Sequence, residues 1–290
     1  MSIFYKKGFD KLGNMLYNRS VKHDETQRDR NLRSVTKGKT PMPRFFVRKE
    51  QIENGVVRIL GDDAHHIARS LRMAAGEKIT VCDMQRMEYQ CELVGFEDDK
   101  AVLARVLESR QMNTEPPFVA HLYQALPKGD KLDTVIQKAV ECGASEIYPF
   151  ESERCVVRVK PEAEARKTER RQKIAAEAAK QCGRSLLPLV SPTLSFAEMI
   201  KRASESDLCL FCYEGEGTEA LGRVLRQALM EKSNPSISVI IGSEGGFAPS
   251  EVSRAREAGM RPVGLGNRIL RTETASGFVL ACLCLLTELE

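Results

Sequence analysis

Hydrophobic and polar positions along the chain follow two different patterns, one before residue 115 and one after it. Between residues 44 and 114 the apolar residues fall in short runs with alternating faces, separated by turn residues such as Glu53-Asn54-Gly55. From residue 118 onward, short apolar runs alternate with longer segments whose apolar positions share one helical face. The first pattern predicts strands, and the second predicts alternating strands and helices.

The first part, residues 42–114, is predicted to be a small β-barrel, because many short strands with alternating faces favour that architecture. A short helix over 64–73 interrupts the strands, with Asp62 and Asp63 as candidates for its cap. The segment Glu115-Pro116-Pro117 is typical of a linker. The predicted strands are 45–47, 56–60, 78–82, 88–96 and 101–107.

The second part, residues 118–290, is predicted to be an α/β domain, because strands that alternate with helices form βα units around a parallel sheet. In the segment 131–142, Leu132, Val135, Ile136 and Val140 share one face, as in an amphipathic helix. The predicted strands are 118–125, 146–150, 208–213, 236–241 and 262–265, and the predicted helices are 131–142, 162–182, 218–232, 249–258 and 272–288.

The formal net charge of +4 says little about the folded part of the chain. Residues 1–41 carry ten of the 44 Lys and Arg residues but only four of the 40 Asp and Glu residues, so the remainder is slightly acidic. A nucleic-acid partner would therefore have to be held by local basic patches. Residues 1–41 are predicted to be a flexible basic extension; an RNA-contacting arm, a transit peptide and a natural start at Met42 are alternatives.

Neither a membrane span nor a secretory signal is evident in the sequence, so we expect a cytoplasmic protein without membrane attachment. The nine cysteines are odd in number and lack the spacing of a metal site. Cys209-x-x-Cys212 and Cys282-x-Cys284, for example, lie in apolar runs. We expect free thiols that pack as small apolar groups in a reducing compartment, and no metal.

Two glycine-rich loops near the C-terminus are the strongest candidates for a ligand site. The first reads Gly242-Ser-Glu-Gly-Gly246, and the second reads Gly264-Leu-Gly-Asn-Arg-Ile-Leu-Arg271. Glycines at the end of a buried strand let a ligand approach the backbone. The two loops therefore predict one pocket at neighbouring strand ends. For the first loop alone, a tight strand–helix turn without a ligand is an equal alternative.

Neither of two common nucleotide-binding motifs fits. The first glycine loop follows a late strand of the domain, and no acidic residue follows it at the ribose distance of the dinucleotide fingerprint. The segment Leu126-Pro-Lys-Gly-Asp-Lys131 lacks the Gly-Lys-Ser/Thr ending of a phosphate-binding loop. NAD and ATP are therefore disfavoured as ligands.

The second glycine loop adds candidate chemistry. Ile269 and Leu270 can frame a flat ring, and Thr272 or Thr274 can cap the last helix. Arg271 lies at a strand–helix junction, which suits an anion or carbonyl partner. The alternative is that Arg271 forms a structural ion pair with one of the nearby acidic residues, Glu244 or Glu273.

Basic residues gather at a few other places. Residues 158–184 contain nine Lys and Arg against four Asp and Glu, which favours either a phosphate-binding helix face or a solvated face of ion pairs. Arg44 and Arg48 flank aromatic residues near the first predicted strand. His65 and His66 have too few possible ligands nearby for a metal, so helix packing with RNA contact is favoured over a metal site.

Taken together, these motifs resemble the RsmE family, bacterial methyltransferases of the SPOUT superfamily that modify N3 of a specific uracil in 16S rRNA. The resemblance runs from Met42 to the C-terminus, with Ser243 standing where the family loop has proline and no counterpart for residues 1–41. The matching motifs are Met42-Pro-Arg-Phe-Phe-Val47, Ala64-His-His-Ile67, Leu71-Arg72, Leu126-Pro-Lys-Gly-Asp130, Gln137-Lys-Ala-Val-Glu-Cys-Gly143, Glu153-Arg154, Glu177-Ala-Ala-Lys-Gln-Cys-Gly-Arg184, Ile241-Gly-Ser-Glu-Gly-Gly-Phe247 and Leu265-Gly-Asn-Arg-Ile-Leu-Arg-Thr-Glu-Thr-Ala275.

The resemblance implies a PUA-like β-barrel that binds RNA, followed by a SPOUT-type parallel-sheet domain with a C-terminal trefoil knot. It also implies that S-adenosylmethionine is the cofactor, that 16S rRNA is the substrate, within the small ribosomal subunit, and that the enzyme is a homodimer. The cofactor contacts we expect are Leu210, Phe211, Gly242, Glu244, Gly245, Gly246, Leu265, Gly266, Ile269 and Leu270. The RNA contacts we expect are Arg44, Arg48, His65, Arg72, Lys128, Arg154 and Arg184.

Methylation of uracil N3 requires the removal of its proton and stabilisation of the resulting negative charge. We hypothesise that Arg271 stabilises the uracilate and that Glu244 or Glu273 orients the base or accepts the proton; a residue of the other subunit is an equal candidate for the acceptor. Two other classes of function compete. A non-catalytic rRNA-binding adaptor predicts decayed glycine loops, and a Rossmann-type enzyme predicts a glycine fingerprint after the first strand of the domain.

Overall fold

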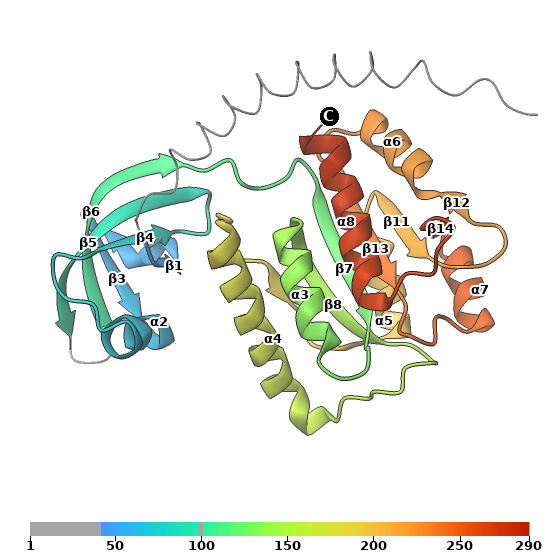
Figure 1. Cartoon of the computed structure of the whole chain (residues 1–290), viewed down its shortest axis with the longest axis horizontal. Helices are drawn as coiled ribbons and strands as arrows, with labels where there is room; N and C mark the ends of the chain where they lie inside the picture. Colours follow the sequence, from blue (N-terminus) through green and yellow to red (C-terminus); the bar gives the residue numbers. More distant parts are fainter. Residues whose placement is uncertain (1–41, 98–100, 290) are drawn as a thin grey trace, which may run out of the picture. The chain divides into compact units, whose positions relative to one another are not determined.

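The structure is a computed structural model that describes residues 42–97 and 101–289 (Figure 1). The predicted basic extension, residues 1–41, lies outside the described residues. Two sheets organise the described chain: a six-stranded sheet from its first part and an eight-stranded sheet from its second part.

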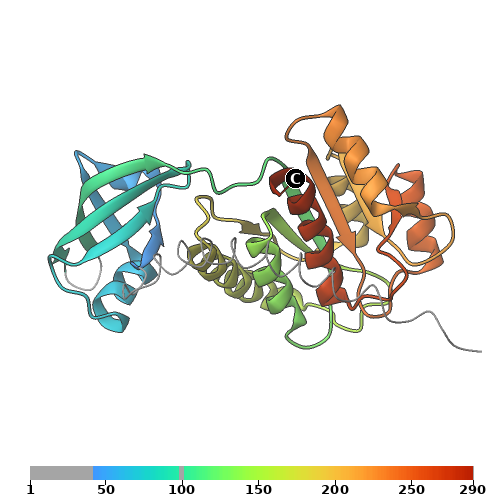
Figure 2. The same ribbon diagram turned by 45° about the horizontal axis from the view of Figure 1, so that its top comes forward.

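The six-stranded sheet has the order β1-β4-β5-β6-β3-β2, in which β1 and β4 are parallel and the other neighbours are antiparallel. Figures 1 and 2 show these strands curving around an interior. Their buried side chains, such as Phe45, Ile59, Ile79 and Leu93, form a core of their own. The strands are β1 (Arg44–Phe46), β2 (Ile52–Glu53), β3 (Val56–Leu60), β4 (Lys78–Cys82), β5 (Met87–Glu97) and β6 (Ala101–Gln111), with a 3₁₀ turn at η1 (Lys49–Gln51).

The short helix predicted over 64–73 begins and ends earlier. Helix α2 (Gly61–His65) continues into one π-helical turn, η2 (His66–Ser70). The predicted caps are wrong, because Leu60 is the N-cap residue and Asp62 and Asp63 lie within the first turn. There the carboxylates are stabilised by the positive end of the helix rather than by capping hydrogen bonds.

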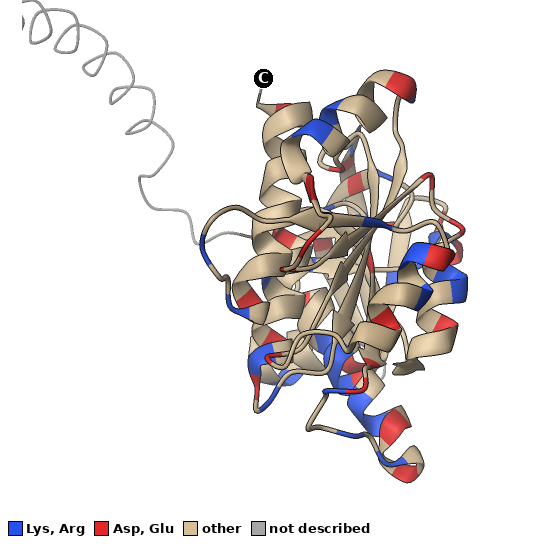
Figure 3. Ribbon diagram, turned by 90° about the vertical axis from the view of Figure 1, so that its right-hand side faces the viewer, with Lys and Arg blue, Asp and Glu red and all other residues tan. Residues whose placement is uncertain are grey.

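The eight-stranded sheet is parallel throughout, as alternating strands and helices predict. Its order is β10-β8-β7-β13-β11-β14-β12, and β9 pairs with β8. Figure 3 shows the sheet edge-on between two layers of helices. The strands are β7 (Val119–Ala125), β8 (Ala144–Glu151), β9 (Leu189–Val190), β10 (Leu194–Ser195), β11 (Leu208–Cys212), β12 (Glu219–Ala220), β13 (Ser236–Ile241) and β14 (Arg261–Gly264).

The helices of this part agree with the predicted ones, with one addition. Helix α5 was not predicted, although Ser195 and Glu198 form a capping box at its start: Ser195 Oγ accepts the Glu198 N–H and Glu198 Oε2 accepts the Ser195 N–H. The helices are α3 (Lys131–Glu141), α4 (Pro161–Cys182), α5 (Phe196–Ala203), α6 (Leu221–Glu231), α7 (Pro249–Glu257) and α8 (Thr272–Glu288).

The predicted linker at Glu115 is part of the folded structure. The Glu115 side chain is only 6% exposed and accepts hydrogen bonds from Arg184 Nε and Nη2, at 3.1 and 2.6 Å. It also accepts the backbone N–H groups of Ser185 and Leu186. Burial raises the pKa of Glu115, but these hydrogen bonds and the charge of Arg184 outweigh it and hold the pKa below its ordinary value.

Candidate functional site

The ends of three parallel strands bring the two glycine loops together. Cys212, the last residue of β11, pairs with Ile241 of β13 on one side and with Val263 of β14 on the other. The segments that follow these strands therefore leave the sheet at the same level. The two loops are not direct neighbours, as the sequence suggested, because β11 lies between their strands.

A cavity of about 590 Å³ lies at these strand ends, and we call it the glycine-loop cavity. Both glycine loops line it, together with the end of β11 and the start of α8. The lining residues are Lys131, Arg154, Cys212, Tyr213, Glu214, Ile241, Gly242, Ser243, Glu244, Gly245, Gly246, Phe247, Pro249, Leu265, Ile269, Leu270, Arg271, Thr272 and Ala275.

The first glycine loop is a tight turn in which two positions favour glycine, one for its backbone conformation and one for lack of space. The Gly246 N–H bonds the Ser243 carbonyl at 2.9 Å, and Gly246 has a φ of 63°, which favours glycine. A Cβ at Gly245 would lie 3.0 Å from Arg154 Cβ. Arg154 in turn donates to the Gly245 carbonyl at 3.1 Å, so the segment after β8 packs against the loop.

The last helix is joined to the first glycine loop through Thr272. The Thr272 hydroxyl donates to the Gly242 carbonyl at 2.6 Å and accepts a hydrogen bond from Gln124 Nε2 at 2.8 Å. The prediction that Thr272 or Thr274 caps α8 is therefore wrong: the N-cap residue is Arg271, with no side-chain cap. The hydroxyl that would have capped the helix fixes the loop instead.

Seven of the ten predicted cofactor contacts line the glycine-loop cavity: Gly242, Glu244, Gly245, Gly246, Leu265, Ile269 and Leu270. Gly266 lies in the second loop with a φ of 105° but does not line the cavity. Leu210 and Phe211 are fully buried within β11 and do not line it either. Their places are taken by Cys212 and Tyr213, because the strand reaches the cavity only at its last residue.

Sequence reasoning also missed polar lining residues. Lys131 begins α3 directly after the Leu126–Asp130 segment. This segment lies near the first glycine loop because β7 pairs with β13, and the sequence does not reveal that pairing. Burial raises the pKa of the Cys212 thiol to about 12, so it lines the cavity as a neutral group. Ser243 Oγ is buried and has no hydrogen-bond partner among the described residues.

Lys131 joins the two candidate carboxylates. Its Nζ lies 2.7 Å from Glu244 Oε1 and 3.6 Å from Glu273 Oε2. Burial raises the pKa of Glu244, but the hydrogen bonds from Lys131 and from the Lys128 N–H outweigh this and lower the pKa below its ordinary value. Glu273 Oε2 is buried and accepts no hydrogen bond within the described residues.

Arg271 lies at the rim of the cavity with its side chain 83% exposed. Its nearest carboxylate oxygen, Glu273 Oε1, is 3.9 Å from Nη1, beyond hydrogen-bond distance. An exposed ion pair of this length contributes little to stability. The structural ion pair that the sequence left open therefore does not occupy the guanidinium, whose donors are available to a ligand.

The residues of the glycine-loop cavity fit an organic ligand with both apolar and polar parts. Leu265, Leu270 and Phe247 supply apolar contact, and the bare backbone at Gly242 and Gly246 supplies close approach. A buried hydroxyl without a partner costs free energy unless a ligand completes its hydrogen bond. A ligand with a polar group near Ser243 would complete the hydrogen bond that Ser243 Oγ lacks among the described residues.

The predicted RNA contacts fall into two groups. Arg48, His65, Arg72, Lys128 and Arg154 have exposed side chains. Arg184 does not fit an RNA contact, because its guanidinium is buried and donates to Glu115 and to the carbonyls of Val140 and Ala144. The guanidinium of Arg44 is also bonded within the protein, because Arg44 pairs with the buried carboxylate of Glu88 and donates to Cys82 Sγ.

The basic segment 158–184 forms ion pairs along α4. Arg170 pairs with Asp133, Arg171 with Glu164, and Lys180 with Glu177. Figure 3 shows blue and red segments interspersed on the helices of this domain. The solvated, ion-paired face, one of the two alternatives, describes this helix better than a continuous phosphate-binding face.

Two further findings concern the described residues only. No helix among them is long and apolar enough to cross a membrane. No group of three or more His, Cys, Asp or Glu side chains within residues 42–97 and 101–289 is arranged to hold a metal ion. All nine cysteines lie in this part of the chain and are free thiols.

Comparisons with known proteins give a consistent result. A family model for an RNA methyltransferase domain matches residues 114–284, and one for an RNA methyltransferase PUA domain matches residues 59–107. The chain is 37% identical over 254 residues to ribosomal RNA small subunit methyltransferase E of Bacillus subtilis, covering 86% of this chain and 98% of the relative. It is 33% identical to the protein of the same name from Synechocystis, covering 84% and 78%.

Two similar solved structures contain a bound ligand. One is a ribosomal RNA small subunit methyltransferase E from Neisseria gonorrhoeae bound to S-adenosyl methionine, with a TM-score of 0.71 and 30% identity over 85% of this chain and 98% of that chain. The other is a putative methyltransferase from Legionella pneumophila in complex with the same cofactor, with a TM-score of 0.74 and 27% identity over 85% and 98%. The PUA-type barrel followed by a SPOUT-type domain, expected from the sequence, is confirmed.

Proposed function

Because the chain belongs to the family of ribosomal RNA small subunit methyltransferase E, we propose that it transfers a methyl group from S-adenosylmethionine to N3 of a specific uridine in 16S rRNA. The observation that carries the proposal is the exposed Arg271 at the rim of a cavity formed by both glycine loops, with an ion-pair contact to Glu273 at 3.9 Å. Similar proteins that bind S-adenosylmethionine support the choice of cofactor. A ribosomal RNA substrate supports a cytoplasmic location as part of this proposal.

We assign S-adenosylmethionine to the glycine-loop cavity, where it supplies an electrophilic methyl group when bound. The backbone of the first glycine loop and the side chains of Leu265 and Leu270 would hold it, and Ser243 Oγ would donate or accept the hydrogen bond it now lacks. The trefoil knot expected for residues of the C-terminal segment is part of the same proposal.

Arg271 stabilises the negative charge that develops on uracil when N3 loses its proton. An exposed guanidinium without a carboxylate within hydrogen-bond distance has planar donors free for the O2 or O4 atom of the base. N3 lies on the pairing edge, so the target base must be unpaired before it can reach this position.

Of the two candidate carboxylates, Glu273 is the better proton acceptor. Glu244 is held in its charged form by Lys131 and the Lys128 N–H, and its lowered pKa makes it a weak base. Glu273 Oε2 accepts no hydrogen bond from the described residues and lies 3.6 Å from Lys131 Nζ. We therefore assign the N3 proton to Glu273 and a positioning role to Glu244, which holds Lys131 in place.

Residues 42–114 form the RNA-binding barrel in this proposal, and residues 118–290 form the catalytic domain. The exposed side chains of Arg48, His65, Arg72, Lys128 and Arg154 remain candidates for contact with the substrate. A non-catalytic adaptor, the main alternative, has no observation in its favour, because both glycine loops line an open cavity.

The outer face of α8 supports a homodimer. Phe278, Ala281 and Leu285 are exposed and recur at helical spacing, and Phe278 and Leu285 are 38% and 49% exposed. Replacement of Phe278 by Glu is expected to convert a dimer to a monomer in light scattering after gel filtration. Met230, 85% exposed on α6, provides the control, because Met230→Glu is expected to leave the mass unchanged.

One experiment tests the proposed reaction directly. N3-methyluridine is mapped in 16S rRNA from cells with and without the gene, and the deletion strain is complemented with the wild-type and Arg271→Ala proteins. We expect the modification to vanish on deletion, to return with the wild type and to stay absent with the variant. Unchanged methylation in the deletion strain would reject the proposed function.

A further inference from the structure

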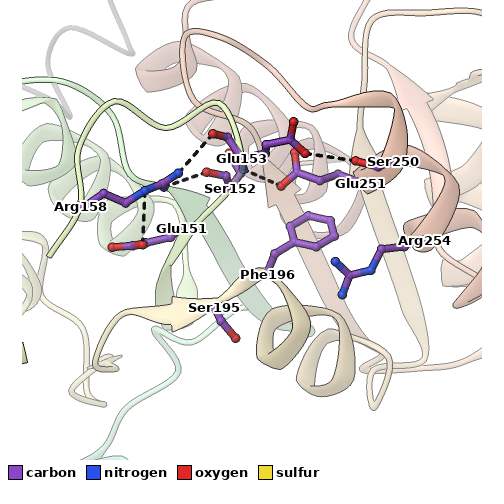
Figure 4. Close-up of a pocket in the computed structure, with 9 residues that line it drawn as sticks. All are labelled: Glu151, Ser152, Glu153, Arg158, Ser195, Phe196, Ser250, Glu251 and Arg254. Atoms are coloured by element: carbon purple, nitrogen blue, oxygen red, sulfur yellow. Dashed lines mark hydrogen bonds and ion pairs between the residues drawn. The ribbon is translucent and has the colours of Figure 1, made fainter.

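A second cavity, of about 380 Å³, adjoins the glycine-loop cavity and is called the Phe196 cavity here. Glu153 lines the Phe196 cavity, whereas the next residue, Arg154, lines the glycine-loop cavity. In the same way, Ser250 lines the Phe196 cavity and the preceding residue, Pro249, lines the glycine-loop cavity. Consecutive residues are about 3.8 Å apart, so the two cavities share a wall. Figure 4 shows the residues that line the second one.

An aromatic ring and an arginine form one side of the Phe196 cavity. The Phe196 ring packs against the rings of Phe150 and Phe247, at centroid distances of 6.2 and 6.4 Å, and Phe247 also lines the glycine-loop cavity. Arg254 Cζ lies over the Phe196 ring, 5.1 Å from its centroid. The Arg254 guanidinium makes no hydrogen bond or ion pair with any other described residue, although its side chain is exposed.

Most charged groups around the cavity are occupied by the protein itself. Glu251 is buried and accepts the N–H groups of Glu153 and Ala248, at 2.8 and 2.9 Å. Arg158 pairs with Glu151 and donates to the carbonyls of Ser152 and Glu153, as the dashed lines in Figure 4 show. These groups build the wall of the cavity and have little capacity left for a ligand.

One cation and one anion remain for a ligand. The cation is Arg254, and the anion is Glu153. Among the described residues, Glu153 Oε2 accepts one hydrogen bond, from the Ser250 hydroxyl at 3.2 Å, and Glu153 Oε1 accepts none. The Glu153 carboxylate would repel a free anion, and the Arg254 guanidinium would repel a cation. A neutral, planar group that carries hydrogen-bond donors fits both.

We propose that the Phe196 cavity holds a nucleobase of the substrate RNA that is adjacent to the target uridine; this inference rests on the proposed function. The base stacks on the Arg254 guanidinium, and its exocyclic amine donates to Glu153. Single-stranded RNA is recognised in this way, by splayed bases that stack on aromatic rings or Arg planes and bond through their edges.

The position of the cavity gives this contact a role in positioning the substrate. Extrusion of the target base breaks its stacking with its neighbour. A stacking site on the other side of the shared wall offsets part of that loss, because the neighbouring base exchanges one stacking partner for another. A base with an exocyclic amine, which uracil lacks, is the preferred occupant.

The test measures binding of a short single-stranded oligoribonucleotide that contains the target uridine. Fluorescence anisotropy with S-adenosylhomocysteine present gives its dissociation constant for the wild type, Arg254→Ala, Arg254→Lys and Glu153→Gln. Arg226→Ala, at an exposed arginine of α6, is the matched control. Calorimetry with S-adenosylmethionine checks that each variant keeps its fold and cofactor affinity.

We expect Arg254→Ala to weaken RNA binding about tenfold, as for the loss of one stacked base, and Arg254→Lys to restore little of it. An abasic nucleotide on one side of the target should weaken wild-type binding equally and have no further effect in Arg254→Ala. Glu153→Gln should weaken binding of an amine-bearing neighbour but not of a uracil neighbour. Arg226→Ala should bind as the wild type does.

Two results would overturn the inference. Full affinity in Arg254→Lys, or a loss that disappears at high salt, would identify a phosphate contact instead of a stacked base. Equal losses from the abasic nucleotide in the wild type and in Arg254→Ala would show that no base contacts Arg254. Failure of the proposed function would look different: the wild type would methylate another atom, or none, whatever the flanking nucleotide.

Discussion

Arg184 and Arg271 both come from basic motifs of the same chain, but their surroundings are opposite. Arg184 is buried, and its guanidinium donates to Glu115 and to two backbone carbonyls. Arg271 is 83% exposed, and no carboxylate within residues 42–97 and 101–289 accepts a hydrogen bond from it. An arginine with most of its donors bonded inside the protein, as in Arg184, holds the fold together, whereas one with free donors is available to a ligand. The comparison gives each residue a separate measurable signature.

The largest expected effect is on stability. Arg184→Met leaves the Glu115 carboxylate buried without its partner, so we expect the free energy of unfolding to fall by about 3–5 kcal/mol. Urea denaturation followed by circular dichroism measures it. Arg170→Met breaks the exposed pair with Asp133 and should cost less than about 1 kcal/mol. Equal losses in the two variants would contradict the structural role of Arg184.

For Arg271 we expect the opposite result, an effect on catalysis without an effect on stability. Arg271→Ala is expected to reduce kcat about 10²- to 10³-fold, the usual result of removing one donor to a developing oxyanion. Its unfolding free energy and cofactor affinity should equal those of the wild type. Arg268→Ala, in the same loop but outside the cavity lining, is the control for kinetics. Full activity of a folded Arg271→Ala would remove Arg271 from the mechanism.

The buried pair also predicts how stability depends on pH. Since the pKa of Glu115 is lowered in the folded protein, its contribution is fully present above the unfolded value of about 4.5 and is lost as the pH falls through the folded value. Glu115→Gln should therefore be less stable than the wild type by about 2 kcal/mol at pH 7. The difference should shrink below pH 4.5 in urea titrations at successive pH values. A difference independent of pH would refute the charged state of Glu115.

The smallest expected effect concerns a single hydroxyl. Ser243→Ala removes the buried Oγ that has no partner among the described residues, so cofactor affinity should fall by about two- to tenfold if a ligand completes that hydrogen bond. Calorimetry with S-adenosylmethionine measures the change. Thr274→Ala, on the exposed side of the first turn of α8, is the control. Unchanged affinity would show that the cofactor does not bond Ser243.

Much of the fold follows from patterns in the sequence, because periodicity reports which face of an element is buried. The parallel sheet and five of its helices are examples, and α5 was missed although Ser195 and Glu198 form its capping box. Strand order is different. No local pattern places β11 between β13 and β14, since that arrangement depends on contacts between residues distant in sequence.

The site shows the same limit. Glycine spacing indicated the two loops, and Ile269 and Leu270 line the cavity as expected. The sequence does not reveal that Lys131 reaches both carboxylates, because it lies more than a hundred residues before them. Nor does it distinguish Arg184, a buried ion-pair partner, from an RNA contact, since a basic side chain in a motif looks the same in both roles.

Helix α8 performs two tasks at once, and this has a thermodynamic consequence. Its first residue, Thr272, bonds the loop carbonyl at Gly242, and its outer face carries the apolar stripe at Phe278 and Leu285. If a second copy packs on that stripe, cofactor binding and self-association both involve the same helix. Linkage then requires that any factor by which cofactor binding changes self-association is also the factor by which self-association changes cofactor binding.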